Sequence, residues 1–422
     1  MGGGQRDLDV VLYGATGSVG ALTARYLARS GTGIRVALAG RSGQRLLALQ
    51  QALGAPARDW PVIVVDPSRP DVFADVATRA RAVVSTVGPY ADHGLPVVAA
   101  CAAAGTDYLD LAAEVPFVRR SIDAYHERAK ESGARIVHSC GFDSIPSDLT
   151  VYALYRRVTA DAAGELGDTT FVLRTANYAT GFSRGTVDTM VELMRAGSDP
   201  ETRRVLDDPY GLSPNHSAEP DLGPQPDVSL HRGEELAPEL SGLWTSGYLM
   251  ALYNTRCVRR TNALLDWRYG RRFRYTETAS MGSSVAAPAL AAMTNATITG
   301  ATRLGGAYLR MFPSGLLQTL ASRPGVAAGD PWRGRYRVET YTTTTNGARY
   351  VSSMAQHGDP GYGATSVLLG ESALAVALDR DRLSTLRGVL TPASAMGDVL
   401  LARLTAAGVE VHTAVLGPGV RA

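Results

Sequence analysis

A glycine-rich stretch near the N-terminus carries the clearest chemical signal in the sequence. Gly14, Gly17 and Gly20 follow a short apolar run and open a segment with helical spacing. Glycines at such a junction permit a tight turn and a close approach of the backbone to a pyrophosphate, which then lies at a helix N-terminus. The stretch predicts a dinucleotide-binding loop, with Thr16 and Ser18 as further contacts.

The end of the second apolar run indicates which nicotinamide cofactor the loop would bind. A carboxylate there favours NAD by accepting from the ribose 2′-hydroxyl, whereas arginine accommodates a 2′-phosphate. The run ends in Arg41 and Ser42, so the sequence predicts NADPH, with these two residues as phosphate ligands. The alternative is that Arg41 is a solvated residue at a helix start. Asp66, after the third run, is expected either to contact the adenine or to cap the next helix.

Two later loops supply the candidate catalytic groups. The fourth run leads into Gly88 and Pro89, which are expected to shape the backbone beside the nicotinamide ribose. Tyr90 and His93 follow, and they are the nearest side chains able to donate a proton at neutral pH. Tyr90 is the favoured donor because a phenol stays protonated at pH 7 without tuning. In the alternative, His93 hydrogen-bonds the backbone of a helix-entry turn. The sixth run leads into a further polar loop, Cys140–Asp148.

A parallel sheet is needed to bring these loops together. Short, mostly β-branched runs alternate with longer helical segments over the first 140 residues, which indicates βαβ units and a doubly wound Rossmann-type sheet. Loops at the carboxyl ends of its strands would surround one ligand crevice. The runs are Val10–Tyr13, Ile34–Ala39, Val62–Val65, Ala82–Thr86, Tyr108–Leu111 and Arg135–His138.

A second, mixed α/β domain with a partly antiparallel sheet is predicted after the Rossmann domain. The expected boundaries are 6–150 for the NADP-binding domain, 151–362 for the substrate domain and 363–422 for C-terminal helices and a strand that pack back between the two. Asn346-Gly347 predicts a type I′ hairpin turn, and Thr391 an N-cap. The predicted strands are Thr169–Thr175, Gly247–Tyr253, Arg271–Thr278, Arg335–Thr345 and Ala348–Ser353, and Asp207–Pro238 is a predicted long loop.

Composition excludes several classes of protein. The 422 residues carry a formal charge of +2, which gives no electrostatic case for a nucleic-acid partner. The three widely spaced cysteines indicate neither a disulfide framework nor a metal site. Lys130 is the sole lysine and His126 stands four residues before it, so the Tyr–Lys pair of short-chain dehydrogenases is absent. We expect a cytoplasmic protein, with peripheral membrane or lipid contact as an open possibility.

Several motifs together resemble the saccharopine dehydrogenase family. Within it, the chain is similar to the branch of trans-acting enoyl reductases of polyketide-type cell-envelope lipids, and the similarity covers nearly the whole chain. The resemblance implies a Rossmann domain followed by an α/β domain whose sheet walls the active site. The motifs are Gly14–Gly20, Thr86–His93, Ala99–Asp110, Cys140–Asp148, Asn254–Asn262, Tyr269–Thr278, Glu339–Tyr350 and Gly388–Leu400.

The resemblance also implies a reaction, the NADPH-dependent reduction of an α,β-unsaturated acyl thioester. Tyr90 or His93 would supply the proton to Cα, and Ser144 or a backbone N–H would hold the thioester oxygen. A carrier domain of a polyketide synthase would deliver the substrate, and oligomeric state is left open. Two basic clusters could meet an acidic carrier domain or a phosphopantetheine phosphate, although a solvated strand or helix face is favoured for any single arginine. They consist of Arg256, Arg259, Arg260, Arg271, Arg272 and Arg274.

Two other functions compete with this one. The chain could be a lipid- or nucleotide-binding scaffold without chemistry, since fold alone does not imply turnover. It could also be an imine or amino-acid reductase, which would need a cationic substrate clamp. The Ala-rich segment Ser283–Phe312 could line a lipid tunnel, rest on a membrane or form an ordinary core helix, and the last is favoured.

Overall fold

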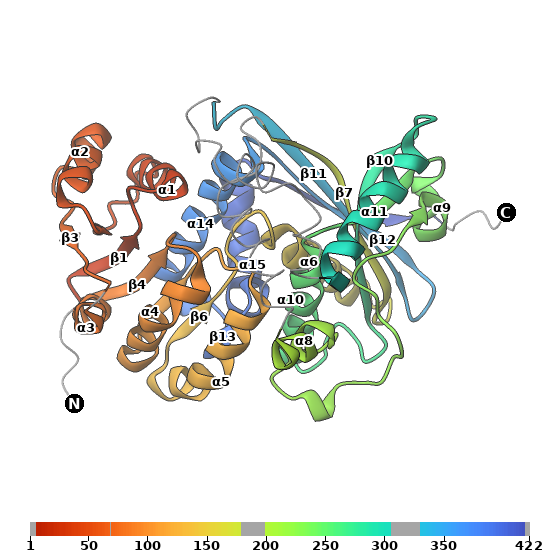
Figure 1. The fold of residues 1–422 in the computed structure, drawn as a ribbon, viewed down its shortest axis with the longest axis horizontal. Coiled ribbons are helices and arrows are strands. Elements are labelled where there is room, and N and C mark those ends of the chain that lie inside the picture. The colour runs from red at the N-terminus through yellow and green to blue at the C-terminus, as the bar shows by residue number, and fades with distance from the viewer. Residues whose placement is uncertain (1–5, 68, 179–198, 305–329, 418–422) are drawn as a thin grey trace.

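Two seven-stranded sheets organise the protein, with a group of helices between them (Figure 1). The computed structural model describes residues 6–67, 69–178, 199–304 and 330–417. Within these ranges, the chain builds the first sheet, crosses to the second, and returns to add one strand to each.

The first sheet is wholly parallel and confirms the predicted doubly wound fold. Its strand order is β13-β6-β5-β4-β1-β2-β3, and the chain order reverses between β1 and β4, where ligands bind in such folds. The seventh strand, β13, pairs with β6 and comes from the C-terminal segment. The strands are β1 Leu8–Tyr13, β2 Val36–Gly40, β3 Val62–Val64, β4 Ala80–Ser85, β5 Asp107–Leu109, β6 Arg135–Val137 and β13 Gly388–Leu390.

Helices cover both faces of this sheet. α14 (Thr365–Leu378) packs against α1 and α15 and contacts β4. The stretch Pro360–Leu378 is apolar and long enough to span a membrane, yet 89% of it is buried inside the protein. Thr391 caps α15, as predicted, by accepting from Ser394 N. The other helices are α1 Ser18–Arg29, α2 Gly43–Leu53, α3 Pro70–Arg79, α4 Tyr90–Ala104, α5 Val115–Ser132, α6 Ile145–Ala160 and α15 Pro392–Ala406.

The second sheet is mixed, as expected. Its order is β14-β12-β11-β7-β10-β9-β8; β7 and β10 are parallel, and the other pairs are antiparallel. α6 packs on it from the side of the first sheet (Figure 1). The strands are β7 Leu166–Tyr178, β8 His231–Arg232, β9 Trp244–Gly247, β10 Arg274–Gly282, β11 Gly334–Thr344, β12 Arg349–His357 and β14 Glu410–Leu416.

Two local predictions in this half of the chain are wrong. The run Gly247–Tyr253 is no strand: β9 ends at Gly247, and α10 (Ala251–Leu264) begins four residues later. A short apolar run suits a buried helix as well as a strand, and α10 is buried along nearly its whole length. The β11–β12 turn is not type I′, because Gly347 alone takes a positive φ of 82°. Thr344 N donates to Ala348 O and closes a three-residue loop instead.

The predicted long loop exists, and arginines fasten it. After α8 (Pro200–Asp207) the chain stays largely irregular until β8 and the short helix α9 (Gly233–Leu236). Arg256 of α10 donates to a carbonyl in the last turn of α8, and Arg259 and Arg260 donate to carbonyls of the segment that follows. The bonds run from Arg256 to Leu206 O, Arg259 to Pro209 O, Arg260 to Leu212 O, Arg271 to Ala218 O and Arg274 to Leu222 O.

This arrangement corrects the predicted carrier-docking face. Arg256, Arg259 and Arg260 are buried, with at most 4% of each exposed, so they cannot meet the surface of another protein. Arg256 also pairs with Asp227 at 2.7 Å. The arginines of α10 therefore fix a loop to the body of the protein, and only Arg271, Arg272 and Arg274 of the predicted set are exposed.

Arg256→Leu is expected to lower the free energy of unfolding by about 2–4 kcal/mol, because it leaves the largely buried Asp227 carboxylate without its charged partner and with only the hydroxyl of Thr255 as a donor. Arg272→Leu, in the exposed set, should change it by no more than about 0.5 kcal/mol. Urea unfolding of both variants checks the difference. Equal stabilities would show that the guanidinium of Arg256 does not hold the loop.

α11 (Ala287–Leu304) is a surface helix rather than the core helix favoured for this segment. Ala287, Ala291 and Ile298 are buried on the side that contacts β9 and β10, while Leu290 and Met293 are exposed. The remainder of the predicted segment, from residue 305 on, lies outside the described residues.

Candidate functional site

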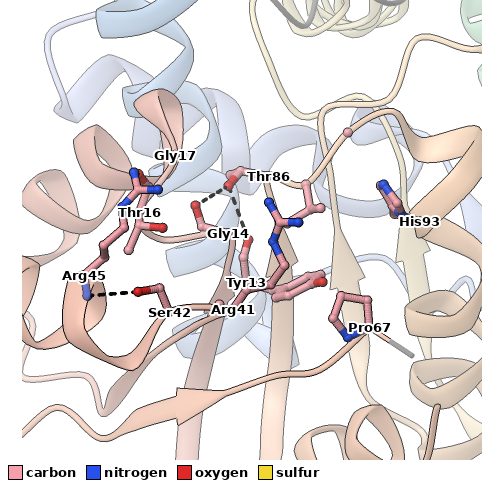
Figure 2. A pocket seen from close by; sticks show the side chains of 13 residues that line it. Tyr13, Gly14, Thr16, Gly17, Arg41, Ser42, Arg45, Pro67, Thr86 and His93 are labelled. Atoms are coloured by element: carbon pink, nitrogen blue, oxygen red, sulfur yellow. Dashed lines mark hydrogen bonds between the residues drawn. The ribbon is translucent and has the colours of Figure 1, made fainter. Parts of the chain in front are cut away.

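A cavity of about 710 Å³ opens at the carboxyl edge of the first sheet, beside β1 and β4 (Figure 2). The ends of β1, β2 and β4, the residues after β3 and the first turn of α4 all contribute to its wall. The structure thus brings together much of the predicted site. The predicted residues that line the cavity are Gly14, Thr16, Gly17, Arg41, Ser42, Gly88 and His93.

Each of the three loop glycines is a glycine for a different structural reason. Gly14 has a φ of 86°, and a Cβ there would stand 2.6 Å from Thr86 Oγ1. A Cβ on Gly20 would stand 2.2 Å from Gly14 O, so this glycine lets α1 pack against the loop. Gly17 is exposed and borders the cavity, and its Cβ would meet only Gly14 O, at 3.2 Å. Of the three glycines, Gly17 is therefore the one that the fold itself requires least.

The N-terminus of α1 provides an anion site at this loop. Its N-cap is Gly17, and no side chain caps the amides of the first turn. These amides and the positive end of the helix dipole suit a pyrophosphate. Thr86 Oγ1 donates to Tyr13 O at 3.2 Å and Gly14 O at 3.1 Å and so fixes the turn from the neighbouring strand (Figure 2). Ser18, the first residue of α1, is exposed but is not part of the cavity wall.

Two arginines stand at the end of β2. Arg41 projects into the cavity, and Arg45, in the first turn of α2, lies beside Thr16 (Figure 2). Arg45 Nη2 donates to Thr16 O at 3.3 Å, and the backbone N–H of Arg45 donates to Ser42 Oγ at 3.4 Å. Arg45 was not predicted from the sequence, although a basic residue in the first helical turn after Arg41-Ser42 is also placed to reach a phosphate there. No carboxylate is among the residues that line the cavity.

Two predicted cofactor contacts lie beside the cavity rather than in its wall. Pro89 occupies the N-cap position of α4, next to Gly88. Asp66 is exposed, and the following residue, Pro67, lines the cavity instead. The carbonyl of Asp66 accepts from Arg69 N just before α3.

Tyr90 is placed for packing rather than for proton transfer. Its hydroxyl donates to Ser85 O at 3.1 Å and accepts from Leu111 N at 3.2 Å. The ring is 7% exposed and packs against Phe117. Burial raises the pKa of the Tyr90 phenol well above its ordinary value. Both hydrogen-bonding directions of the hydroxyl are thus used inside the protein, whereas His93 is exposed and lines the cavity.

Ser144 belongs to a buried polar network that joins the two sheets. Its hydroxyl donates to Asn254 Oδ1 at 2.8 Å, so its proton is not free for a thioester oxygen. Asn254 Nδ2 donates to Glu277 Oε2 at 3.1 Å, and Tyr275 Oη donates to Glu277 Oε1 at 2.8 Å. Burial raises the pKa of Glu277 to about 7. The network ties the loop after β6 to α10 and β10.

Asp148 extends this connection to a third element. Its Oδ1 accepts from Thr261 and its Oδ2 from Ala393 N, in the first turn of α15. It therefore caps the distant helix α15 rather than α6, the helix in which it lies. Burial raises the pKa of this carboxyl to about 6.

The pH dependence of stability is expected to report on Glu277. Because the fold holds its proton more tightly than the unfolded chain, with a pKa of about 7 against 4.5, this stabilisation is fully present below pH 4.5 and is lost as pH rises through 7. The loss amounts to roughly 3 kcal/mol. Glu277→Gln should remove that part of the slope in urea unfolding at several pH values, while Asp92→Asn, at an exposed carboxyl, should keep it. An unchanged slope in Glu277→Gln would contradict the assignment.

A Ser–His–Asp arrangement elsewhere in the Rossmann domain is structural. His138 lies 2.7 Å from Asp110 Oδ2 through Nδ1 and 2.9 Å from Ser121 Oγ through Nε2. All three side chains are buried, and none lines the cavity. A catalytic serine must be reachable by its substrate, and Ser121 is not. The three side chains therefore serve to hold the end of β6 against α5. Among the described residues, no three His, Cys, Asp or Glu side chains could share a metal ion.

Comparison with known proteins agrees with this geometry. Residues 10–137 match the model of the saccharopine dehydrogenase NADP binding domain. A Mycobacterium tuberculosis protein, provisionally named as a trans-acting enoyl reductase, is 58% identical over 97% of this chain and 98% of its own. Proteins named trans-acting enoyl reductase from Mycobacterium ulcerans and Mycobacterium bovis are 55% and 54% identical, over 97% and 98% of this chain and 99% of theirs.

The solved structures show the same fold at low sequence identity. Saccharopine dehydrogenase (L-Glu forming) from Saccharomyces cerevisiae aligns over 97% of this chain and 99% of its own, with a TM-score of 0.55 and 13% identity. The near-complete matches to the mycobacterial proteins, together with the NADP-binding domain matched over residues 10–137 of this chain, settle the family. The chain belongs to the saccharopine dehydrogenase family, in the branch whose members are named trans-acting enoyl reductases.

Proposed function

We propose that the chain is an NADPH-dependent enoyl reductase that saturates the α,β-double bond of an acyl thioester. The observation that carries the proposal is the cavity, because a glycine loop at the N-terminus of α1 and two arginines after β2 line the same space. The names of the relatives support the reaction type.

The residues of the cavity fit NADPH. Gly17 leaves the space that a side chain would fill, and the uncapped amides of α1 suit the pyrophosphate. Arg41 and Arg45 suit a 2′-phosphate, since a guanidinium can donate two parallel hydrogen bonds to it. Ser42 supplies a hydroxyl between them. With no carboxylate in the wall, nothing there favours a free 2′-hydroxyl.

For this reaction the protein has to orient the cofactor and the acyl thioester relative to each other and to deliver a proton. NADPH, when bound, supplies a hydride. Gly88, which has no side chain, lines the cavity just after β4. His93 lines it from the first turn of α4. Of the three residues predicted to be catalytic, we retain His93 as a contact of cofactor or substrate. Tyr90 and Ser144 are better explained by their hydrogen bonds within the fold.

The substrate is proposed to arrive on an acyl carrier domain of a polyketide synthase, because trans-acting reductases serve a synthase from outside it. We place the enzyme in the cytoplasm, where NADPH and the synthase would be. An amino-acid imine would need a cationic clamp, but Arg256, Arg259 and Arg260 already donate to carbonyls inside the protein. The structure offers no observation that favours the imine reaction.

Turnover of model thioesters tests the proposal. NADPH absorbance should fall when the protein meets a crotonyl or longer 2-enoyl pantetheine thioester, and mass spectrometry should show the saturated product. Keto acid plus amine should give no oxidation. NADPH binding without oxidation by any thioester would favour a binding scaffold, and oxidation with keto acid plus amine alone would favour the imine reductase.

A further inference from the structure

One carboxyl group in the loop after β6 stands apart from its neighbours. Nearly every polar side chain of this loop has an assigned partner: Ser139 bonds Ala112 O and Tyr253, Ser144 bonds Asn254, and Asp148 bonds Thr261 and Ala393. Asp143 is the exception, since its half-buried carboxyl makes no hydrogen bond or ion pair with any described residue. Carboxyls that are withdrawn from water without a partner are costly and call for an explanation, such as a functional role.

The surrounding backbone is held firmly. Ser139 takes a positive φ of 69°, a conformation that costs energy for a residue other than glycine. Phe142 N donates to Thr365 Oγ1 at 3.1 Å, and Asp143 O accepts from Asn254 Nδ2 at 2.7 Å. Bonds on both sides therefore fix the peptide that carries Asp143, while its side chain makes no hydrogen bond within the described part of the chain. Such a loop can present a reactive group with little loss of order.

The position of the loop also suits a role in the reaction. β6 lies two strands from β4 in a parallel sheet, so its carboxyl end is about 10 Å from the end of β4 at a spacing of about 4.8 Å per strand. Gly88, after β4, lines the cavity at that same edge. Asp143 does not line the cavity itself, so a donor role requires a thioester that extends from the cavity towards the loop after β6.

We propose that the carboxylic acid of Asp143 is the proton donor to Cα of the enoyl thioester. This inference rests on the proposed function. When the hydride of NADPH has formed the C–H bond at Cβ, the electron pair of the double bond is held as an enolate. That pair then takes the proton of Asp143 and forms the C–H bond at Cα. Asp143 is left as a carboxylate and regains its proton from water.

The protonation behaviour of Asp143 supports this assignment. Burial alone raises the pKa of its carboxyl to about 6, and no charged neighbour contributes. The titratable groups nearest along the hydrogen-bonded framework are Glu277 on β10 and Asp148 on α6, and neither adds to the shift. An acyl chain that excludes water from the loop would raise the pKa further, so the acid form would be present where the reaction needs it.

Asp143→Asn tests the donor role, with His93→Asn as the competing variant. The wild-type kcat should fall as pH rises above 6, whereas Asp143→Asn should lower kcat by about 10²- to 10⁴-fold and flatten this part of the profile. NADPH affinity, followed by fluorescence, should stay within about twofold. Asp143→Glu should recover part of the rate. In infrared titration of the cofactor-free protein, the carboxyl absorption that titrates near pH 6 should be weaker in Asp143→Asn than in the wild type, with the contribution of Asp148 remaining.

The outcomes separate the donor role from the reaction itself. A nearly wild-type kcat and pH profile in Asp143→Asn would overturn the role, as would a large loss confined to His93→Asn. An infrared titration near pH 6 that is the same in Asp143→Asn and in the wild type would remove its physical basis. Absence of turnover in the wild type with every thioester would remove the proposed reaction and this role together.

Discussion

Gly17→Val is expected to abolish measurable binding of both NADPH and NADH while the protein stays folded. Gly17 borders the cavity, and its backbone, with φ of −74°, is one that any residue can adopt. A valine there would place its methyl groups between the N-terminus of α1 and the pyrophosphate, so that the amides could no longer reach the ligand. Fluorescence titration with each cofactor measures the loss, and thermal unfolding without cofactor measures the fold.

Gly20→Val is the informative control for this prediction. Its Cβ would meet Gly14 O at 2.2 Å, so this variant should lose stability as well as binding. The two glycines lie about one helical turn apart. Gly17 borders the cavity, whereas Gly20 packs against the backbone of Gly14. Normal NADPH binding by Gly17→Val would mean that the pyrophosphate lies elsewhere.

The glycine loop and the place of Arg41 beside it were predictable because both depend on local spacing. Gly14, Gly17 and Arg41 lie within a few residues of the strand ends that position them. The alternation of short buried strands with helices then fixes where those ends meet, because parallel strands align their carboxyl ends. Such information is carried by neighbouring residues, and a single sequence contains it.

The fates of Tyr90 and Arg260 could not be predicted in this way. The hydroxyl of Tyr90 is taken by Leu111 N, which is 21 residues away, and the guanidinium of Arg260 by Leu212 O and Val389 O, 48 and 129 residues away. A tyrosine after a cofactor-facing turn and an arginine in a basic cluster have the same local patterns whether they point outward or inward. Packing against residues far away in the chain decides whether such a side chain points outward or inward, and that packing cannot be derived from a local sequence pattern.

The seventh strand illustrates the same limit at the level of the fold. β13 has three residues, and it joins β6 from a position more than 250 residues later in the chain. So short a run has no periodicity to identify it. Its pairing depends on α14, which precedes it and returns the chain to the first sheet (Figure 1). The prediction that the C-terminal segment packs back between the domains could not specify this pairing.

Arg41→Ala and Arg45→Ala are each expected to weaken NADPH binding by about 1.5–3 kcal/mol, or roughly 10- to 150-fold in Kd, with NADH binding almost unchanged. The reason is that a guanidinium donates charge-assisted hydrogen bonds to a 2′-phosphate but has no comparable partner in a 2′-hydroxyl. Both arginines line the cavity at the end of β2. The measurement is isothermal titration with each cofactor at one ionic strength, since surface electrostatics weaken with salt.

The double variant carries the sharper expectation. If Arg41 and Arg45 clamp one phosphate, removal of the second arginine should cost less than removal of the first, because two charges that share a ligand do not act independently. Arg25→Ala, at an exposed position on α1 away from the cavity wall, controls for the loss of one positive charge and should leave both affinities unchanged. Equal losses for NADPH and NADH in Arg41→Ala would show that this side chain steadies the loop rather than reads the phosphate. If only Arg45→Ala weakened NADPH and NADH binding equally, the role of Arg45 would be limited to its hydrogen bond to Thr16 O. The preference for NADPH would then rest on Arg41 and Ser42.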